Sequence, residues 1–404
     1  MLDQHTIDLV KATAPALADK GLNVTLRMYD LMFTNNPEVK PLFNMANQSP
    51  NGQPLALARS VHAYAANIDN LEALAPAVEL IANKHASLGV RPEHYGIVGS
   101  NLLQALKEVM DLSEEQMQAW ATAYNFLADV FIDAEAKLYE QVEKQEGGWQ
   151  DYRTFQVDRV VQESETVTSF YLKPKDRGQL ASFKPGQYVT VRFDFPGANV
   201  VTRNYSLSDA PNGEYYRISI KRERRPPARA QWHDGLVSCY LHDYYRPGME
   251  VQLRAPMGHF FLDPDTSRPV VLLSGGVGIT PMISMVNAVA RDYPRLAAYF
   301  IHGALNRHTH AMREHVRSLA ESHRNIHVHI CYSEPDAEDL KQGFCDKTGF
   351  ITADWLGRIL PTRDCDYYFC GPNAFMQTAY EILKEWNVPP AQIHYEFFGP
   401  AGEL

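Results

Sequence analysis

The sequence predicts a multidomain protein: an all-helical part, then a small antiparallel β-barrel, then an α/β part with a parallel sheet. Up to about Glu146, apolar residues recur at three- and four-residue spacing, which is typical of amphipathic helices. At Gly147-Gly148 this pattern stops, and short apolar runs separated by Pro- and Gly-containing turns follow. From Pro269 onward, apolar strands alternate with helical stretches. We therefore predict domains at 1–146, 147–264 and 265–404.

The helical part shows signals for where several helices begin and end. A short helix is expected from Pro37 to Phe43, and further helices over 55–69, 76–83 and 95–110, the last opened by Tyr95. Gly89 and Pro92 are expected to break the chain between these last two helices. Ser113-Glu114-Glu115-Gln116 is a capping pattern that predicts a long final helix to about Gln145.

The two later parts are predicted from short strands. In the barrel we expect strands over 153–161, 166–172, 187–193, 204–208 and 216–221. In the α/β part we expect strands over 270–274, 297–302, 326–332 and 367–370.

Composition excludes several classes of protein. A net charge of −10 and a pI near 5.8 argue against a nucleic-acid partner, which favours a basic face. The first five residues lack a secretory pattern, and no apolar run reaches the ~20 residues of a membrane span. Five cysteines without C-x-x-C spacing favour reduced thiols over disulfides or zinc. We expect a cytoplasmic protein, and a monomer.

The helical part contains residues suited to a heme pocket. His85 lies near a helix end, and neutral imidazole is a good ligand for heme iron. Residues suited to the other positions around a planar cofactor are Phe43 against the ring and, on the opposite side, Tyr29, Leu57 and Gln53.

On the His85 side, Glu135 is a candidate to bond the imidazole N–H, which strengthens the histidine as an electron donor. Tyr95 is a candidate to hold that carboxylate. Each residue also has an ordinary explanation, as a core, loop or solvated side chain, and taken singly each is better explained that way.

The barrel carries a candidate flavin site in Arg203-Asn204-Tyr205-Ser206. The arginine supplies a fixed cation for a pyrophosphate, the tyrosine can pack on the flavin, and the serine can bond its edge. Pro185-Gly186-Gln187-Tyr188 precedes this strand. Gly235-Leu236-Val237-Ser238 follows it and opens a helix whose backbone N–H groups can take phosphate.

The α/β part carries a candidate dinucleotide site in Ser274-Gly275-Gly276-Val277-Gly278-Ile279-Thr280-Pro281. Its glycines allow the backbone to approach a pyrophosphate at a helix N-terminus. We expect Thr280 to cap that helix and Pro281 to lie in its first turn. Cys370-Gly371-Pro372 ends a later strand, where open α/β sheets place ligands.

With these motifs in this order, the chain resembles the flavohemoglobins, which join a globin to a ferredoxin-reductase-like FAD domain and an NAD(P) domain. The resemblance covers essentially all 404 residues. It implies heme b, FAD and NAD(P)H as cofactors, with His85 as the axial heme ligand and Tyr29 as the distal tyrosine. It also implies Tyr95 and Glu135 as a proximal catalytic pair.

The resemblance extends to the route between the cofactors. It implies that Lys84 lies between heme and flavin, together with Glu396 near the C-terminus. It implies that Phe397-Phe398-Gly399-Pro400 cover the flavin, with Phe398 on the nicotinamide side, and that Cys370-Gly371-Pro372 borders the nicotinamide. The connection at 222–234 looks longer and more basic than the family's usual one, and we interpret it as a solvated loop, with a role toward FAD or dinucleotide phosphate left open.

The activity implied by the resemblance is nitric oxide dioxygenation: NAD(P)H reduces FAD, FAD reduces heme, and heme-bound O2 oxidises NO to nitrate. An oxygen store or redox sensor with its own reductase, and a heme-free helical module on a flavin reductase, are alternatives. The sequence does not decide whether the cofactor is NADH or NADPH. Arg307 has two interpretations: it meets the 2′-phosphate of NADPH, or it is an ordinary surface residue. A lipid or peroxide substrate is also left open.

Overall fold

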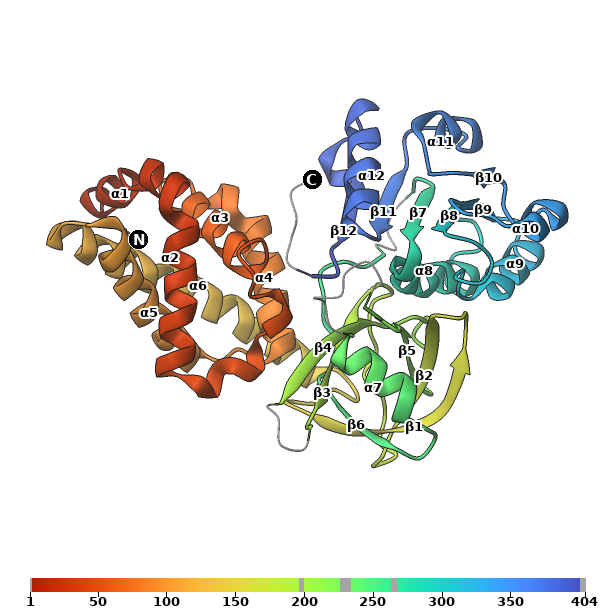
Figure 1. The fold of residues 1–404 in the computed structure, drawn as a ribbon, viewed down its shortest axis with the longest axis horizontal. Helices are drawn as coiled ribbons and strands as arrows, with labels where there is room; N and C mark the ends of the chain where they lie inside the picture. The colour runs from red at the N-terminus through yellow and green to blue at the C-terminus, as the bar shows by residue number, and fades with distance from the viewer. Residues whose placement is uncertain (1, 196–199, 226–233, 263–266, 400–404) are drawn as a thin grey trace.

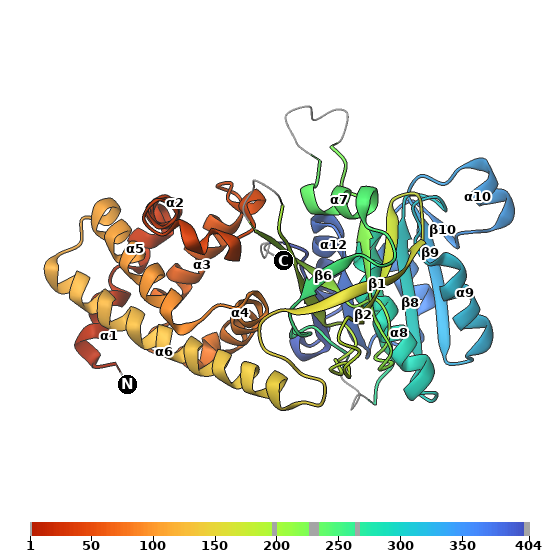
Figure 2. The same ribbon diagram turned by 90° about the horizontal axis from the view of Figure 1, so that it is seen from below.

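The computed structural model describes residues 2–195, 200–225, 234–262 and 267–399, and these form three bodies. Figure 1 shows the helical body on the left, the barrel below the centre, and the parallel-sheet body at upper right. The predicted fold class, helical then antiparallel barrel then α/β, is therefore confirmed. Figure 2 shows the same division from below, with α4 as a helix that faces the barrel.

The helical body packs around a core that includes Met28, Leu106 and Trp120, all buried. Its elements are α1 Gln4–Lys11, α2 Ala14–Asn35, η1 Pro37–Leu42, η2 Met45–Asn47, α3 Gln53–Ala66, η3 Leu71–Leu74, α4 Ala75–Leu88, α5 Pro92–Met110 and α6 Glu114–Lys144. The predicted cap of α6 is confirmed, because the Ser113 hydroxyl accepts from the backbone N–H of Gln116 at 3.2 Å.

Two predicted helix boundaries were wrong. α4 does not stop near residue 83 but continues to Leu88, so the whole of the His85 turn is helical. α5 begins at Pro92 and not at Tyr95, because the ring of Pro92 fixes a helical φ, and the N–H that proline lacks would have no partner at the first position of a helix. Pro92 therefore starts a helix where we expected it only to break one.

The barrel is a six-stranded antiparallel sheet in the order β4-β3-β6-β1-β2-β5. An isolated bridge between Leu207 and Ile218 joins its two edges. Its elements are β1 Arg153–Gln162, β2 Val167–Pro174, β3 Tyr188–Phe193, β4 Val201–Ser206, β5 Tyr216–Lys221, α7 Leu236–Tyr244 and β6 Glu250–Leu253. The five predicted strands are present, although β4 lies a few residues earlier than 204–208, and β6 was not predicted.

The third body is a six-stranded parallel sheet in the order β10-β9-β8-β7-β11-β12. Its elements are β7 Val270–Gly275, η4 Gly276–Gly278, α8 Ile279–Asp292, β8 Ala298–Ala304, α9 Arg313–Ser322, β9 Ile326–Tyr332, α10 Ala337–Gln342, β10 Lys347–Thr348, α11 Ala353–Ile359, β11 Asp366–Cys370, α12 Asn373–Glu385, η5 Pro390–Gln392 and β12 Ile393–Glu396. Strand order reverses between β7 and β11, and open sheets of this kind bind ligands at that point.

Helices cover both faces of this sheet. Successive side chains of a strand point to opposite faces, so each strand contributes to two cores. Along β7, Val270 and Leu272 belong to a core shared with α8 and α9. Val271 and Leu273 belong to a separate core shared with α11 and α12. Within the ranges described above, no helix is both long and apolar enough to cross a membrane.

Candidate functional site

His85, Tyr95 and Glu135 come from three different helices and meet beside the last turn of α4. The Nδ1 atom of His85 lies 2.8 Å from Glu135 Oε1 and 3.0 Å from the Tyr95 hydroxyl, which itself donates to Glu135 Oε1 at 2.5 Å. A carboxylate only accepts, so the Nδ1 atom of His85 carries the ring proton. The lone pair of Nε2 is therefore left for a ligand.

The interior of the helical body also holds a tyrosine whose hydroxyl is unpaired. Tyr29 is 6% exposed, stacks on Phe33 with ring centroids 5.6 Å apart, and meets Phe43 edge-on at 5.8 Å. Burial raises the pKa of Tyr29, and no hydrogen-bond partner lies within reach of its hydroxyl among the residues that the structure describes. This hydroxyl is therefore available to donate a hydrogen bond to a ligand.

The remaining predicted heme-pocket residues lie directly after η1 and on α3. Leu57 and Phe43 are partly buried against the same core as Tyr29. Gln53 is the first residue of α3, and its Oε1 atom accepts from Gln48 at 2.9 Å. An imidazole with a free Nε2 and an unpaired buried hydroxyl in one helical body fit a heme with an axial histidine and a polar group for its gaseous ligand.

Lys84 and Glu396 bring the helical body into contact with the end of β12. Lys84 Nζ lies 3.6 Å from Glu396 Oε1, although the two residues are 312 positions apart in the sequence. Burial raises the pKa of Glu396, which Lys84 opposes, and its Oε2 atom has no hydrogen-bond partner in the described chain. Phe397 is buried, Phe398 is half exposed, Gly399 has a φ of +148°, and Pro400 lies outside the described residues.

Arg203 is a partly buried cation on β4 without an anionic partner. Its Nη1 atom donates to the backbone oxygen of Thr202 at 2.7 Å. Burial lowers the pKa of Arg203, and no carboxylate within the described ranges forms an ion pair with it. Desolvating a guanidinium is unfavourable without an anion, so the geometry fits the pyrophosphate of a dinucleotide such as FAD.

Alternation along β4 places Asn204 and Ser206 of the predicted flavin motif on one face of the strand and Tyr205 on the other. Ser206 is buried, while Asn204 is exposed and accepts from the Thr190 hydroxyl at 2.8 Å. Tyr205 is partly buried, and burial raises its pKa. Tyr188, on the neighbouring β3, donates to the hydroxyl of Ser87 in α4 at 3.3 Å. This contact connects the strand of the predicted flavin site to the helix of His85.

Ser238 lies in the first turn of α7, as predicted. Its hydroxyl accepts from the backbone N–H of Glu223 at 3.2 Å and donates to Gly235 O at 3.3 Å. Of the basic connection at 222–234, residues 226–233 lie outside the described residues, and Arg222 forms an ion pair with Asp243 at 2.5 Å.

The glycine loop between β7 and α8 allows two strand ends to approach closely. A Cβ atom on Gly278 would lie 2.1 Å from the backbone oxygen of Cys370. We expected Thr280 to cap α8, and this prediction was wrong. The N-cap is Gly278, and the Thr280 hydroxyl donates to Val277 O at 3.1 Å. The first N–H groups of α8 are therefore left without a side-chain cap, as a phosphate-binding helix requires. Pro281 lies in the first turn, as predicted.

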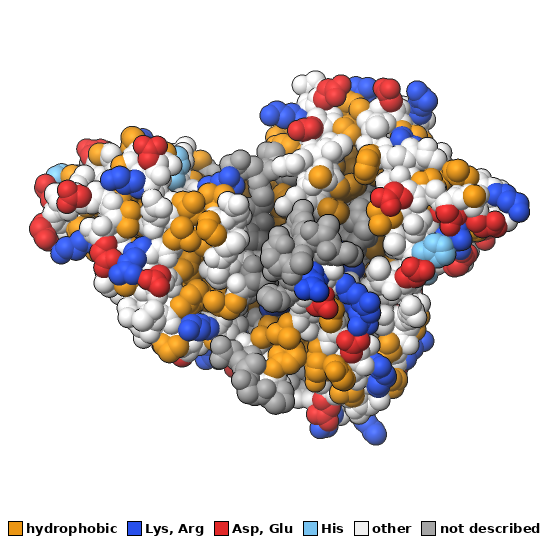
Figure 3. Space-filling view, viewed as in Figure 1, with side chains coloured by type: hydrophobic (Ala, Val, Ile, Leu, Met, Phe, Trp, Pro, Cys, Tyr) orange, Lys and Arg blue, Asp and Glu red, His pale blue; other side chains and the backbone are white. Residues whose placement is uncertain are grey.

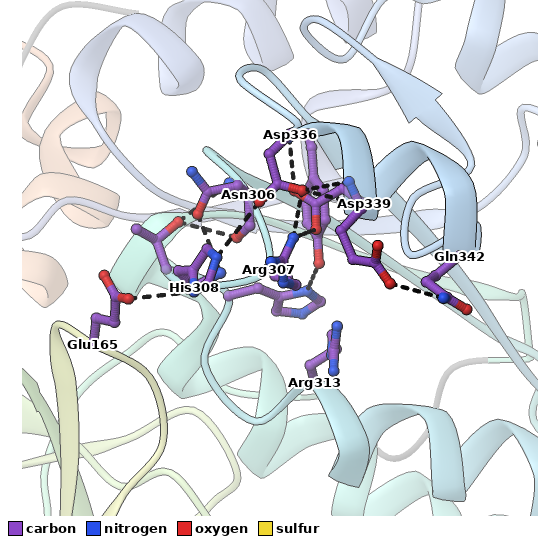
Figure 4. A network of polar contacts seen from close by, with 12 residues as sticks. Glu165, Asn306, Arg307, His308, Arg313, Asp336, Asp339 and Gln342 are labelled. Atoms are coloured by element: carbon purple, nitrogen blue, oxygen red, sulfur yellow. Dashed lines mark hydrogen bonds and ion pairs between the residues drawn. The ribbon is translucent and has the colours of Figure 1, made fainter.

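Arg307 is part of a polar network and is not plain surface (Figure 4). Its Nη1 atom contacts Asp336, and lies 3.1 Å from Asp339 Oδ1, which is fully buried. His308, the next residue, lies 3.2 Å from Glu165 of the barrel. Two carboxylates already hold the Arg307 guanidinium, which leaves it poorly placed to attract a 2′-phosphate.

The sequence did not point to His259, which lies beside Lys84. Burial, and then the charge of Lys84, lower the pKa of His259 to about 4, so this ring is neutral at pH 7. No motif surrounds this histidine, and only the packing of the barrel against α4 brings it to the junction.

Three family models match consecutive parts of the chain. They are the globin model over residues 26–131, the oxidoreductase FAD-binding domain over 154–262, and the oxidoreductase NAD-binding domain over 272–381. Their order agrees with the three bodies of the fold.

Full-length relatives are also found. The chain is 47% identical to a flavohemoprotein of Bacillus cereus over 405 residues, which covers all of both chains. It is 47% identical over 410 residues to a flavohemoprotein of Halalkalibacterium halodurans, covering 100% of this chain and 98% of that one.

Two solved structures resemble this protein. A flavohemoglobin from Malassezia yamatoensis with bound FAD and heme superposes with a TM-score of 0.85 at 23% identity, covering 98% of this chain and all of that one. The FAD/NAD-binding domain of a nitric oxide dioxygenase from Vibrio cholerae O1 biovar El Tor gives a TM-score of 0.55 at 36% identity, covering 62% of this chain and all of that one.

Proposed function

Because this chain belongs to the flavohemoprotein family, we propose that it is an NAD(P)H-dependent nitric oxide dioxygenase. The similarity of its two C-terminal bodies to the reductase module of a nitric oxide dioxygenase supports this proposal. The overall conversion balances as 2 NO + 2 O2 + NAD(P)H giving 2 nitrate + NAD(P)+ + H+. When bound, heme supplies the iron at which O2 and NO react, and FAD divides the two electrons of a hydride into single electrons.

In this proposal His85 holds the iron through Nε2, and Glu135 and Tyr95 hold the proton at Nδ1. The ring orientation is fixed by the hydrogen bonds of 2.8 and 3.0 Å at Nδ1. An imidazole whose other nitrogen donates to a carboxylate is a stronger electron donor to a metal. The pair therefore favours activation of oxygen over simple reversible storage.

Tyr29 supplies a polar group of the opposite wall in this proposal. Phe33 and Phe43 pack against its ring and give this wall an apolar lining. In a dry site a single hydrogen bond is stronger than in water. The hydroxyl of Tyr29 can then orient O2 and stabilise the negative charge that O2 acquires on reduction.

The observation that carries the proposal is the contact between Lys84 and Glu396, 3.6 Å apart. It connects the helix of the iron ligand directly to the last strand of the reductase. A store or sensor needs its iron reduced only after occasional oxidation, whereas dioxygenation consumes one electron at every turnover. A short, fixed route between the reductase and His85 is what repeated reduction requires.

Nitrate formation tests this proposal against an oxygen store or sensor. Purified holoprotein, supplied with NAD(P)H, O2 and successive additions of NO, is expected to form nitrate over many turnovers, with one NAD(P)H consumed per two nitrates. A yield that stops at one nitrate per heme would favour the store or sensor. Absence of an intense Soret band from the folded protein would instead indicate a heme-free helical module.

The surface and the cysteines support proposals about partners and location. On the face drawn in Figure 3, acidic and basic side chains are mixed over all three bodies, as expected of a protein that does not bind nucleic acid. All five cysteines are free thiols, which fits a reducing cytoplasm. We propose a cytoplasmic monomer whose substrates are O2 and NO, with domains at 1–146, 147–264 and 265–404.

A further inference from the structure

One loop of the barrel connects the predicted flavin strand to the dinucleotide helix. The loop at 208–211 follows β4, the strand of Arg203, after the single residue Leu207. It contacts α8, which starts directly after the glycine loop at 276–278. Figures 1 and 2 show α8 on the side of the parallel-sheet body that faces the barrel strands.

The contact is made of hydrogen bonds from α8 to the loop. Asn287 donates from Nδ2 to Asp209 Oδ1 at 2.7 Å, and Ser284, which is fully buried, donates to the backbone oxygen of Asp209, also at 2.7 Å. Arg291 donates to the backbone oxygen of Pro211. Three side chains on successive turns of α8 therefore hold the loop.

The carboxylate of Asp209 is also fixed from the barrel side. Its Oδ1 accepts from the backbone N–H of Ala210 at 2.9 Å, and its Oδ2 accepts from the Tyr215 hydroxyl at 2.9 Å. Arg217 Nη1 lies 3.8 Å from Oδ2, and both side chains are largely buried, 7% and 17% exposed. Unlike an exposed ion pair, this group has one orientation set by several partners.

We propose that Asp209 is a positioning residue for hydride transfer, acting through its hydrogen bond to Asn287. The proposal depends on the NAD(P)H-to-FAD step of the proposed function. In that step the C4–H bond of the nicotinamide breaks and its two electrons and proton pass to the flavin, giving NAD(P)+ and reduced FAD. Since α8 begins at the phosphate loop and β4 bears Arg203, Asp209 sets the distance between the two ligands. A misplacement of ~1 Å can slow such a step about a hundredfold.

Replacement of the hydrogen bond by a repulsion tests the proposal. Asn287→Asp puts a second carboxylate where Asn287 now donates to Asp209, and like charges at this distance repel. We expect flavin reduction by NADH, followed anaerobically by stopped-flow absorbance at pH 8, to slow at least ~tenfold relative to the parent. FAD content and the Kd for NAD+ by calorimetry should stay unchanged, while hydrogen exchange of the 208–212 segment should rise.

Two further measurements distinguish positioning from general damage. The double variant Asp209→Asn/Asn287→Asp leaves a single carboxylate at the interface and so removes the repulsion, and it should recover roughly tenfold of the lost rate. His315 of α9 also faces this pair, with its Nε2 atom 2.7 Å from Asn287 Oδ1. In Asn287→Asp alone, the deficit should shrink as pH falls, because the carboxylate pair takes up one proton and the His315 imidazole, whose pKa is lowered by burial, becomes charged beside it. Ser318→Asp, which adds the same charge at an exposed position of α9, should reduce flavin at the parent's rate.

Flavin reduction by Asn287→Asp at the parent's rate, or equal slowing in the single and double variants, would overturn the proposal. If Asn287→Asp does not fold, Asn287→Ala replaces it in the experiment, because this variant removes the hydrogen bond without adding a repulsion. Flavin reduction by Asn287→Ala at the parent's rate would reject the role of Asp209. These experiments contain no NO. A protein that shows the slowing and the recovery but makes no nitrate would therefore refute the dioxygenase proposal alone.

Discussion

At the scale of single residues, His85, Tyr95 and Glu135 show what the sequence alone can and cannot predict. Their residue types suggested a heme ligand and its support, and the resemblance assigned them roles. Their contact, with polar atoms at most 3.0 Å apart, depends on how α4, α5 and α6 pack, since the residues are 10, 40 and 50 positions apart. No local pattern encodes such packing, so taken singly each residue was better explained as ordinary structure.

His85→Ala is expected to give a folded protein that retains FAD and little heme, because the helical body then lacks its imidazole ligand. Heme and flavin content, measured from absorbance after purification, check this. His5→Ala, at an exposed histidine of α1 paired with Glu115, is the control and should retain both cofactors. Full heme content and an unchanged spectrum in His85→Ala would remove this residue from the iron site.

Tyr29→Phe keeps the ring and its contacts with Phe33 and Phe43 and removes only the unpaired hydroxyl. Losing a hydrogen bond of about 1–1.5 kcal/mol should raise the rate of O2 dissociation roughly tenfold, and more in a dry pocket. Flash photolysis or stopped flow measures this rate, and NO consumption should fall most at low oxygen.

Reduction of a dye that takes electrons directly from FAD is the control for Tyr29→Phe, and should be unchanged because that route bypasses the helical body. An O2 dissociation rate equal to the parent's would contradict the role given to this hydroxyl.

At the scale of elements, the local signals were informative where they depend on chain stereochemistry. The capping box at Ser113 and the glycine loop before α8 were found in this way. Pro92 was misread because a proline can end one helix or begin the next, and the sequence around it permits both. Thr280 was misread because the loop tightens into a 3-10 turn, which moves the N-cap to Gly278.

Arg203→Ala should weaken FAD binding, because β4 then has no cation for a pyrophosphate. Charge-assisted contacts of about 1.5–3 kcal/mol correspond to roughly 10- to 150-fold in Kd. Flavin retention after dialysis is the measurement. The matched control is Arg192→Ala on the neighbouring β3, where the arginine is paired with Asp194 at 3.0 Å, and equal retention in both variants would count against the role of Arg203.

Gly278→Ala should block NAD(P)H-dependent flavin reduction while FAD stays bound. The new methyl group would lie 2.1 Å from the backbone oxygen of Cys370, so the loop or the end of β11 has to move. Anaerobic reduction by NADH measures the effect, and Gly96→Ala, where a Cβ meets no atom within 4 Å, is the control. A Gly278→Ala protein that reduces its flavin as fast as the parent would show that this close approach does not form the dinucleotide site.

At the scale of the whole molecule, the order of the three bodies was predictable because the period of apolar residues changes twice along the chain. The contacts between the bodies were not predictable. Tyr188 with Ser87, Asp209 with Asn287, and Lys84 with Glu396 join residues 101, 78 and 312 positions apart. Each of these contacts joins a few polar atoms, so it leaves no pattern of apolar residues in the sequence. Together the contacts connect the three candidate cofactor sites.

The fate of the oxygen atoms tests the central claim most directly. Holoprotein turning over NADH and unlabelled NO under 18O2 should form nitrate in which two of the three oxygen atoms are 18O, as mass spectrometry would show. Both atoms of O2 then reach one nitrogen, as the balanced reaction requires. Nitrate with one labelled atom or none, or labelled nitrate whose amount does not depend on NADH, would contradict a dioxygenase driven by the route from the nicotinamide through FAD to the His85 site.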